Sequence, residues 1–459
     1  MINIRNLPFI IFTLLLCGLL CSCDKNARDL DNVDSENYET LLSHLSGKSR
    51  PNVLIISFDA LRTDALGAYG NQQGASPRMD AFAEQSLVFD QAYTAGNTTP
   101  TSFASAFTGL YPFRAFKKWA LVETVTLAEV FHSAGYKTAA FLNNTWPDTA
   151  RNYHLGFDDF ETSHIVDENE FVKLPAAWLR ENHNQRIFVW IHFISPHEPY
   201  DYREMAAKFY NQDYEGRFKT TSGDFGDLYR VKGPKETARL KELYIGEVYY
   251  ADFLFGKLFD LFIELGLMEN SIVILTADHA EEHMEHSLLS HRQLYEEVIR
   301  IPMIIYHPEK RSAQRTSIPY LNVDLVPTFA SMLQQPVPPG LDGIDLRSVH
   351  PKPRPILSVS MTDYKFCSMS LRLGDHKLIE FCPPVGPITE LFDLSADPGE
   401  KNNLYAEGME IASELAELMR ELAGDAPCNV ISRARAGLPS DHNLDEETVE
   451  RLRSLGYVD

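Results

Sequence analysis

Five short apolar runs rich in β-branched residues are spaced along this chain, and they restrict its fold more than any other feature. They cover residues 52–58, 137–142, 187–194, 271–276 and 302–306. Continuous runs of this kind are typical of strands that are buried on both faces. Helical patterns lie between them, for example over residues 126–134 and 237–265. Strands that alternate with helices predict an α/β protein, in which a mostly parallel central sheet is covered by helices on both sides.

The pattern changes after about residue 354. Short alternating segments at residues 356–359, 368–373, 377–380 and 390–393 predict antiparallel strands, and residues 411–422 predict a helix. We therefore expect a main domain over residues 50–350 and a small C-terminal α+β subdomain over residues 351–459. A charged amphipathic helix at residues 445–455 is expected near the end of that subdomain.

The first 22 residues have the pattern of an export signal. Arg5 precedes an apolar run at residues 7–20 that is too short for a comfortable membrane span. The run ends in Leu20-Cys21-Ser22-Cys23, which resembles a bacterial lipobox with Cys23 as the lipidated residue. The alternative is an ordinary cleaved signal. We expect residues 23–49 to form a polar tether, with the protein lipid-anchored in the bacterial cell envelope, in the inner or outer membrane, and facing the periplasm.

Charge and cysteine content limit the partners and the compartment. The 459-residue chain has a net charge of −22, which argues against nucleic-acid binding, and we expect membrane contact only through the lipid anchor. An anionic substrate stays compatible, because a metal ion can invert the local field. Export implies an oxidising compartment. Cys367 and Cys382 flank a hairpin-like stretch, so we expect a disulfide between them; the alternative is that these two and Cys428 are three buried free thiols.

Polar residues follow three of the predicted strands. Asp59 ends the first, His197 follows the third, and the adjacent pair Asp278 and His279 follows the fourth. Ligands of open α/β sheets bind beyond the carboxyl ends of the strands, so these side chains can converge although they are far apart in sequence. Two carboxylates and an imidazole can hold one divalent metal ion. Zinc or manganese suits a set that contains histidine, and calcium, which prefers oxygen ligands, is the alternative.

Thr99 places a hydroxyl beside this predicted metal site. Pro100 suits the start of a helix over residues 100–107, which makes Thr99 its expected N-cap. Taken alone, Thr99 is then a capping residue and nothing more. Next to a metal held by Asp59, Asp278 and His279, its hydroxyl becomes a nucleophile for a sulfate or phosphate ester and a fourth candidate ligand.

Histidines supply candidates for proton transfer. His197, between two prolines, and His291 are the imidazoles that we expect at the ester, where they bind its oxygens or assist the leaving group. His192, within the third strand, is expected to be a core residue or one that supports the ligands. The other polar residues between residues 279 and 291 are expected to lie on a solvated face; they include Glu281, Glu282 and Glu285.

Together these segments resemble the sulfatase family of the alkaline phosphatase superfamily. The resemblance rests on residues 52–62, 99–112, 195–200, 275–282, 294–302, 374–379, 390–394, 397–400 and 455–457, in that order along the chain. It implies an alkaline-phosphatase-like α/β/α sandwich, a small C-terminal subdomain, a divalent metal, and hydrolysis or transfer of sulfate or phosphate esters. The main domain would then be the catalytic one.

Three positions depart from the family pattern. Sulfatases that use formylglycine carry Cys or Ser where this chain has Thr99, and threonine cannot be oxidised to that aldehyde. Ala60 stands where the family has a second aspartate, so one metal ligand is missing. Phe103 stands where relatives with a threonine nucleophile often have histidine. The remaining site residues are similar to the single-metal site of relatives that transfer phosphoryl groups. They are Asp59, Thr99, Asp278 and His279.

The predicted function is therefore a metal-dependent hydrolase or transferase of sulfate or phosphate esters, with phosphoesters or phosphodiesters favoured. Thr99 would attack the ester and form a covalent intermediate. The expected substrate is a sulfated or phosphorylated small molecule, lipid head group or glycan. Two alternatives stay open: a sulfuric ester hydrolase in the strict sense, and a sulfatase-fold binding protein with weakened catalysis, which Ala60 and Phe103 motivate.

Overall fold

The structure is a computed structural model that describes residues 40–41, 44–45, 50–117, 119–163, 165–218, 231–348, 353–361, 367–383 and 386–436. Its centre is an eight-stranded sheet in the order β13-β2-β12-β9-β1-β8-β6-β7. The strands are β1 (Asn52–Phe58), β2 (Leu87–Phe89), β6 (Lys137–Leu142), β7 (Asp159–Thr162), β8 (Ile187–Phe193), β9 (Ser271–Ala277), β12 (Met303–Tyr306) and β13 (Gln314–Thr316). Strands β9, β1, β8, β6 and β7 are mutually parallel, and β12 is antiparallel to both of its neighbours. The predicted mostly parallel sheet is confirmed.

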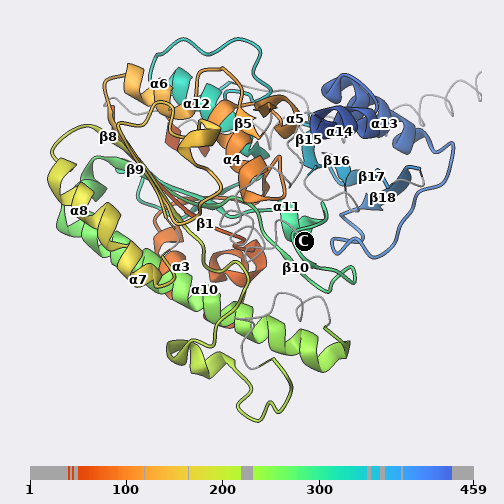
Figure 1. Ribbon diagram of the computed structural model, residues 1–459, viewed down its shortest axis with the longest axis horizontal. Coiled ribbons are helices and arrows are strands. Elements are labelled where there is room, and N and C mark those ends of the chain that lie inside the picture. The colour runs from red at the N-terminus through yellow and green to blue at the C-terminus, as the bar shows by residue number, and fades with distance from the viewer. Residues whose placement is uncertain are drawn as a thin grey trace, which may run out of the picture.

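Helices cover both faces of this sheet (Figure 1). One layer contains α3 (Pro77–Ala83), α7 (Glu168–Phe171), α8 (Lys173–Asn182) and α10 (Gly233–Glu264), and the other contains α4 (Thr99–Thr108), α5 (Pro112–Ala115), α6 (Leu127–Ser133) and α12 (Leu325–Met332). Helix α6 begins after Thr126, which forms a capping box with Glu129. Among the described residues, no helix combines the length and apolar character that a membrane span needs.

Short elements complete the main domain. They are β3 (Ala92–Tyr93), β4 (Phe116–Lys117), β5 (Ala120–Leu121), β10 (Glu282–His283), β11 (Leu289–Ser290), β14 (Tyr320–Leu321), α11 (Glu296–Ile299) and the 3₁₀ turns η1 (Thr63–Ala65), η2 (Gly67–Tyr69), η3 (Thr149–Arg151), η4 (Glu204–Phe209), η5 (Leu267–Glu269) and η6 (Asn322–Asp324). Strands β10 and β11 pair as a hairpin. This hairpin contradicts the predicted solvated face, because Glu281 and Glu282 are buried. Tyr200 donates a hydrogen bond to Glu281, and Gln293 donates one to Glu282.

The C-terminal unit is a four-stranded antiparallel sheet with two helices. It contains β15 (Ile356–Ser360), β16 (Ser368–Leu373), β17 (His376–Phe381), β18 (Ile388–Asp393), α13 (Glu410–Ala423) and α14 (Pro427–Ala436). The sheet is joined to the main domain through its first strand, where the Val359 N–H donates to the Ala95 carbonyl at 2.9 Å. Buried Tyr93 and Leu294 of the main domain pack in the same apolar cluster as Leu357 of this sheet. The unit is therefore fused to the main domain through a shared core.

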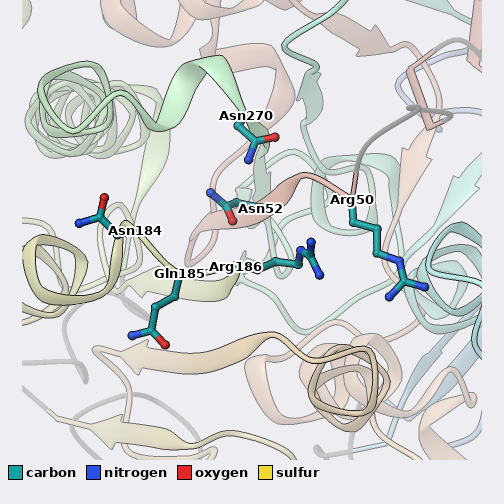
Figure 2. A pocket seen from close by; sticks show the side chains of 6 residues that line it. All are labelled: Arg50, Asn52, Asn184, Gln185, Arg186 and Asn270. Atoms are coloured by element: carbon teal, nitrogen blue, oxygen red, sulfur yellow. The ribbon is translucent and has the colours of Figure 1, made fainter.

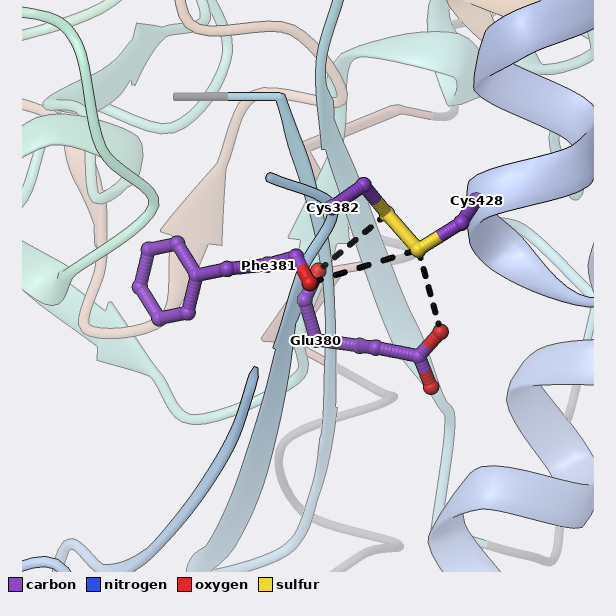
Figure 3. The surroundings of a disulfide bond; sticks show 4 residues. All are labelled: Glu380, Phe381, Cys382 and Cys428. Atoms are coloured by element: carbon purple, nitrogen blue, oxygen red, sulfur yellow. Dashed lines mark hydrogen bonds between the residues drawn. A yellow bond between two sulfur atoms is a disulfide. The ribbon is translucent and has the colours of Figure 1, made fainter. Parts of the chain in front are cut away.

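The predicted disulfide between Cys367 and Cys382 is wrong. Cys382 is bonded to Cys428 instead, with 5.3 Å between their Cα atoms (Figure 3). Cys367 does lie opposite Cys382 in the hairpin, where the Cys382 N–H donates to the Cys367 carbonyl at 2.8 Å. Helix α14 packs on this sheet and brings the Cys428 sulfur to Cys382, and no local sequence pattern reports a partner 46 residues away. Cys23 and the helix predicted at residues 445–455 lie outside the described residues.

A polar surface pocket lies at the amino ends of β1, β8 and β9 (Figure 2). Its volume is about 390 Å³, and its lining residues are Arg50, Asn52, Asn184, Gln185, Arg186 and Asn270. The predicted site residues follow the carboxyl ends of the same strands, at the opposite end of each strand from this pocket. This pocket is therefore separate from the predicted site.

Candidate metal centre and active site

The register of three parallel strands brings the predicted site residues together. Phe58 at the end of β1 pairs with Phe193 of β8 on one side and with Ala277 of β9 on the other. The next residues along β1 and β9, Asp59 and Asp278, therefore leave the sheet side by side. This arrangement is the convergence at strand ends that the sequence predicts.

Asp59, Asp278 and His279 form the centre of the site. The His279 Nε2 atom lies 3.4 Å from Asp59 Oδ1 and 3.6 Å from Asp278 Oδ2. In a tetrahedral site with metal–ligand bonds of about 2.1 Å, two ligand atoms are about 3.4 Å apart. All three side chains are fully buried, and within the described part of the chain none of these three atoms has a hydrogen-bond partner. Buried polar groups without partners need an explanation, and a shared cation supplies one.

In each of the two carboxylates, one oxygen accepts hydrogen bonds from the protein and the other faces His279. Asp278 Oδ1 accepts hydrogen bonds from the backbone N–H groups of Ala60, at 3.3 Å, and His279, at 2.8 Å. Asp59 Oδ2 accepts from the Thr99 hydroxyl and from Asn144 Nδ2, both at 3.1 Å. The second oxygen of each carboxylate is thereby fixed toward His279. The residues present fit a divalent metal ion.

His192 also belongs to this cluster. Its Nε2 atom lies 3.6 Å from Asp59 Oδ2, and Asp59, His192 and Asp278 offer ligand atoms within 4.8 Å of one another. Its other ring nitrogen lies 2.9 Å from Ser57 Oγ, which accepts a hydrogen bond from the Trp190 indole at 2.8 Å. These contacts fix the orientation of the imidazole, so His192 either supports Asp59 or binds the metal directly.

Thr99 presents its hydroxyl to the centre because it does not cap its helix. The sequence predicts Thr99 as the N-cap, but helix α4 begins at Thr99 and its N-cap is Thr98. The Thr98 N–H donates to Thr101 Oγ1 at 3.2 Å, so this pair forms the capping contacts. Asn144 Nδ2 lies 3.5 Å from Thr99 Oγ1. Asn144 is a site residue that sequence reasoning missed, since an asparagine after a strand carries no specific signal.

His197 and His291 form a pair beside the centre. Their Nε2 atoms lie 3.2 Å apart, and the His291 ring centroid is 4.4 Å from that of His279. Burial alone would lower the pKa of His197, but the negative charge of Asp59, Glu281 and Glu198 raises it to about 9. Burial and the neighbouring imidazoles lower the pKa of His291. The pair therefore carries one positive charge, on His197, and His291 accepts a hydrogen bond from the His197 ring.

The electrostatics of the two aspartates differ. Burial would raise the pKa of Asp59, but His197 and the other nearby imidazoles lower it below its usual value. Burial and the charge of Asp59 raise the pKa of Asp278. Asp59 is thus ionised, and its negative charge disfavours ionisation of Asp278. A divalent cation between the two carboxylates would stabilise the ionised form of both.

Phe103 closes the site from the side of the helix layer. Its ring contacts the His192 ring edge-on, with centroids 4.7 Å apart, and it also packs against Trp190 and Phe107. The side chain is buried. Phe103 therefore makes an apolar wall behind His192 and offers no group for acid–base chemistry.

Comparison with known proteins places this chain in a family. A family model described as Sulfatase matches residues 51–335, and one described as N-sulphoglucosamine sulphohydrolase, C-terminal, matches residues 284–425. An ulvan-active sulfatase of Formosa agariphila is 24% identical over 429 residues, which cover 82% of this chain and 81% of the relative. An N-acetylglucosamine-6-O-sulfatase of Bacteroides thetaiotaomicron is 24% identical over an alignment of 479 residues, gaps included. The alignment covers 81% of this chain and 86% of the relative.

Solved structures show the same fold. One, in complex with its substrate D-glucosamine-2-N,6-O-disulfate, superimposes with a TM-score of 0.69 at 21% identity and covers 83% of this chain and 99% of its own. A phosphonate monoester hydrolase of Agrobacterium radiobacter has a TM-score of 0.67 at 18% identity, with 82% and 96% covered. Because the first family model spans more than half of the sequence, the chain belongs to the sulfatase family of ester hydrolases.

Proposed function

We propose that this chain hydrolyses sulfate esters of a saccharide through a nucleophilic Thr99 beside one divalent metal ion. The observation that carries the proposal is the convergence of Asp59, Asp278 and His279 on one point, with the Thr99 hydroxyl 3.1 Å from Asp59. The relatives support the substrate class, because they include an ulvan-active sulfatase and an N-acetylglucosamine-6-O-sulfatase. They favour sulfate over the phosphoester preference that the residues alone indicated.

The metal, of which zinc and manganese fit the ligands best, would be held by Asp59, Asp278 and His279 and would neutralise charge that develops on the ester oxygens. Thr99 Oγ1 attacks sulfur, and its proton passes along its hydrogen bond to Asp59. The bond from sulfur to the sugar oxygen breaks, and the leaving oxygen takes the proton that His197 and His291 share. The first half of the reaction gives the free sugar alcohol and Thr99 sulfated on Oγ1.

Water completes the cycle. Neutral His197 takes a proton from a water molecule that attacks sulfur, the bond between sulfur and Thr99 breaks, and Thr99 recovers its proton from Asp59. Hydrogen sulfate leaves and His197 is protonated again. His291 keeps the His197 imidazole in place through their 3.2 Å contact.

The second candidate is hydrolysis of phosphate or phosphonate esters by the same residues. The sequence favours it, because Thr99 and the three metal-ligand candidates are similar to the single-metal set of relatives that transfer phosphoryl groups. The structural similarity to a phosphonate monoester hydrolase points in the same direction. We also propose, from the sequence alone, that the enzyme acts in the bacterial cell envelope and is anchored through Cys23.

Turnover by the purified protein tests these proposals. Glucosamine 6-sulfate, p-nitrophenyl sulfate, p-nitrophenyl phosphate and p-nitrophenyl phenylphosphonate would be assayed with Zn²⁺ or Mn²⁺. Thr99→Ser keeps the hydroxyl and should retain measurable turnover, whereas Thr99→Ala should lose at least about 1,000-fold in kcat. Sulfate turnover that survives Thr99→Ala would refute the nucleophile. If the protein binds metal but turns over none of these esters, the result would instead favour a binding protein with the sulfatase fold.

A further inference from the structure

A second cluster of potential metal ligands lies between the main domain and the C-terminal unit. His286 is in the turn of the β10–β11 hairpin, Glu297 is in α11, and Glu400 follows β18. One ligand atom from each residue lies within 4.8 Å of the other two. The hairpin and the C-terminal sheet lie on the same side of the molecule (Figure 1). The cluster thus joins three segments that the chain brings together from two units.

Two of the atoms that face one another in this cluster lack hydrogen-bond partners. Among the residues that the structure describes, His286 Nε2 and Glu297 Oε2 remain without a hydrogen bond. The His286 side chain is 9% exposed and that of Glu400 is fully buried. Lys377 Nζ lies 2.8 Å from Glu400 Oε1 as an ion pair, and a carboxylate oxygen has a second lone pair that can bind another cation.

The spacing matches that of the first centre. His286 Nε2 lies 3.6 Å from Glu297 Oε2, and the same separation joins His279 Nε2 to Asp278 Oδ2. Both values are close to the separation of about 3.4 Å expected between two ligands of a tetrahedral zinc ion. The His286 ring stacks on Tyr295 with 3.5 Å between centroids and 8° between planes, so its orientation is fixed before any ligand binds.

The local charge favours a cation. Two basic side chains of the described residues near the cluster are already paired with carboxylates: Arg372 lies 2.9 Å from Glu296, and Lys377 is shared between Glu296 and Glu400 of the cluster itself. Within the described part of the chain, Glu297 has only the His286 imidazole as an ion-pair neighbour, and its side chain is 12% exposed. A buried carboxylate is normally paired with a cation or coordinates a metal.

We propose that His286, Glu297 and Glu400 form a second divalent-cation site, with zinc as the preferred ion and water in the fourth position. Imidazole nitrogen and carboxylate oxygen are both ligand types that zinc accepts. The ion would fasten the hairpin to the C-terminal unit. Because His291 directly follows β11 of that hairpin, the second site would also help to fix the position of His291. The proposal is independent of the reaction, since an inactive chain can still bind two ions.

Metal counting tests this site without an activity assay. The purified full chain would be loaded with Zn²⁺, dialysed against metal-free buffer and analysed by inductively coupled plasma mass spectrometry. We expect two equivalents for the wild type, one for His286→Gln, one for Asp278→Asn, and none for the double variant. His183→Gln, which removes a partly exposed histidine outside both clusters, is the matched control and should keep two equivalents.

Glu297→Gln provides a second variant of nearly the same shape if His286→Gln does not fold, and it should also hold one equivalent. Circular dichroism verifies that each counted variant is folded. A folded His286→Gln or Glu297→Gln that keeps the wild-type zinc content would overturn the proposal, and His286 and Glu297 would then be a simple ion pair. A wild type that binds one equivalent, lost only in Asp278→Asn, would overturn it equally.

Discussion

The Cys382–Cys428 disulfide gives the most quantitative prediction. It joins the end of β17 to α14 across a sequence separation of 46 residues. In the chain-entropy description, a crosslink stabilises the folded state because it restricts the unfolded chain, and the effect grows with the logarithm of the loop length. For a loop of 46 residues the expression gives about 4 kcal/mol at 25 °C. We therefore expect Cys382→Ser to lower the free energy of unfolding by about 4 kcal/mol.

Urea unfolding followed by far-UV circular dichroism, with and without dithiothreitol, measures this effect. The reductant should destabilise the wild type by a similar amount and should leave Cys382→Ser and Cys428→Ser unchanged. Cys367→Ser is the matched control, because Cys367 lies directly across the hairpin from Cys382 but is not part of the bond. Its unfolding should still respond to dithiothreitol. Loss of that response in Cys367→Ser, with retention in Cys428→Ser, would refute the assigned pairing.

Three further predictions concern the core, the pH dependence and the metal. Burial and the charge of Arg62 lower the pKa of His283 to about 3, so the unfolded chain binds this proton more tightly. Stability should fall by about 1.4 kcal/mol per unit as pH decreases from 6.5 toward 3, and His283→Gln should flatten this slope in urea titrations with EDTA present. Phe103→Ala should cost about 3–5 kcal/mol in the same titrations, because it empties a buried aromatic contact with His192; a cost below 1 kcal/mol would contradict that packing. EDTA should lower the melting temperature of the wild type more than that of Asp278→Asn in scanning calorimetry, and equal shifts would argue against a metal at this residue.

The sheet and the strand-end residues could be predicted because they depend on local sequence. A buried strand needs a run of apolar side chains, and the polar residue that ends the run marks the edge of the sheet. Asp59 and Asp278 are found in this way before any contact is known, and the structure brings both to His279. Asn144 could not be found, since its role depends on β6 lying two strands away from β1.

Burial in the β10–β11 hairpin was mispredicted for a tertiary reason. A stretch with several glutamates and histidines is typical of a solvated surface, and nothing in its order shows otherwise. Glu281 is nevertheless buried because Tyr200, from a distant loop, donates to it, and Arg62 donates to its backbone carbonyl at 2.9 Å. Buried polar groups are tolerated where such partners exist, and partners from elsewhere in the chain leave no local trace.

The position of one helix start has the largest consequence for function. Thr98 and Thr99 are equivalent as capping residues on sequence, and Pro100 permits either choice. If Thr99 were the cap, its hydroxyl would accept a backbone N–H in the first turn and would be turned away from Asp59. In the structure Thr98 and Thr101 make the capping contacts, and the Thr99 hydroxyl donates to Asp59 Oδ2. A shift of one residue therefore separates a helix cap from a nucleophile, and tertiary contacts with Asp59 and Asn144 decide between them.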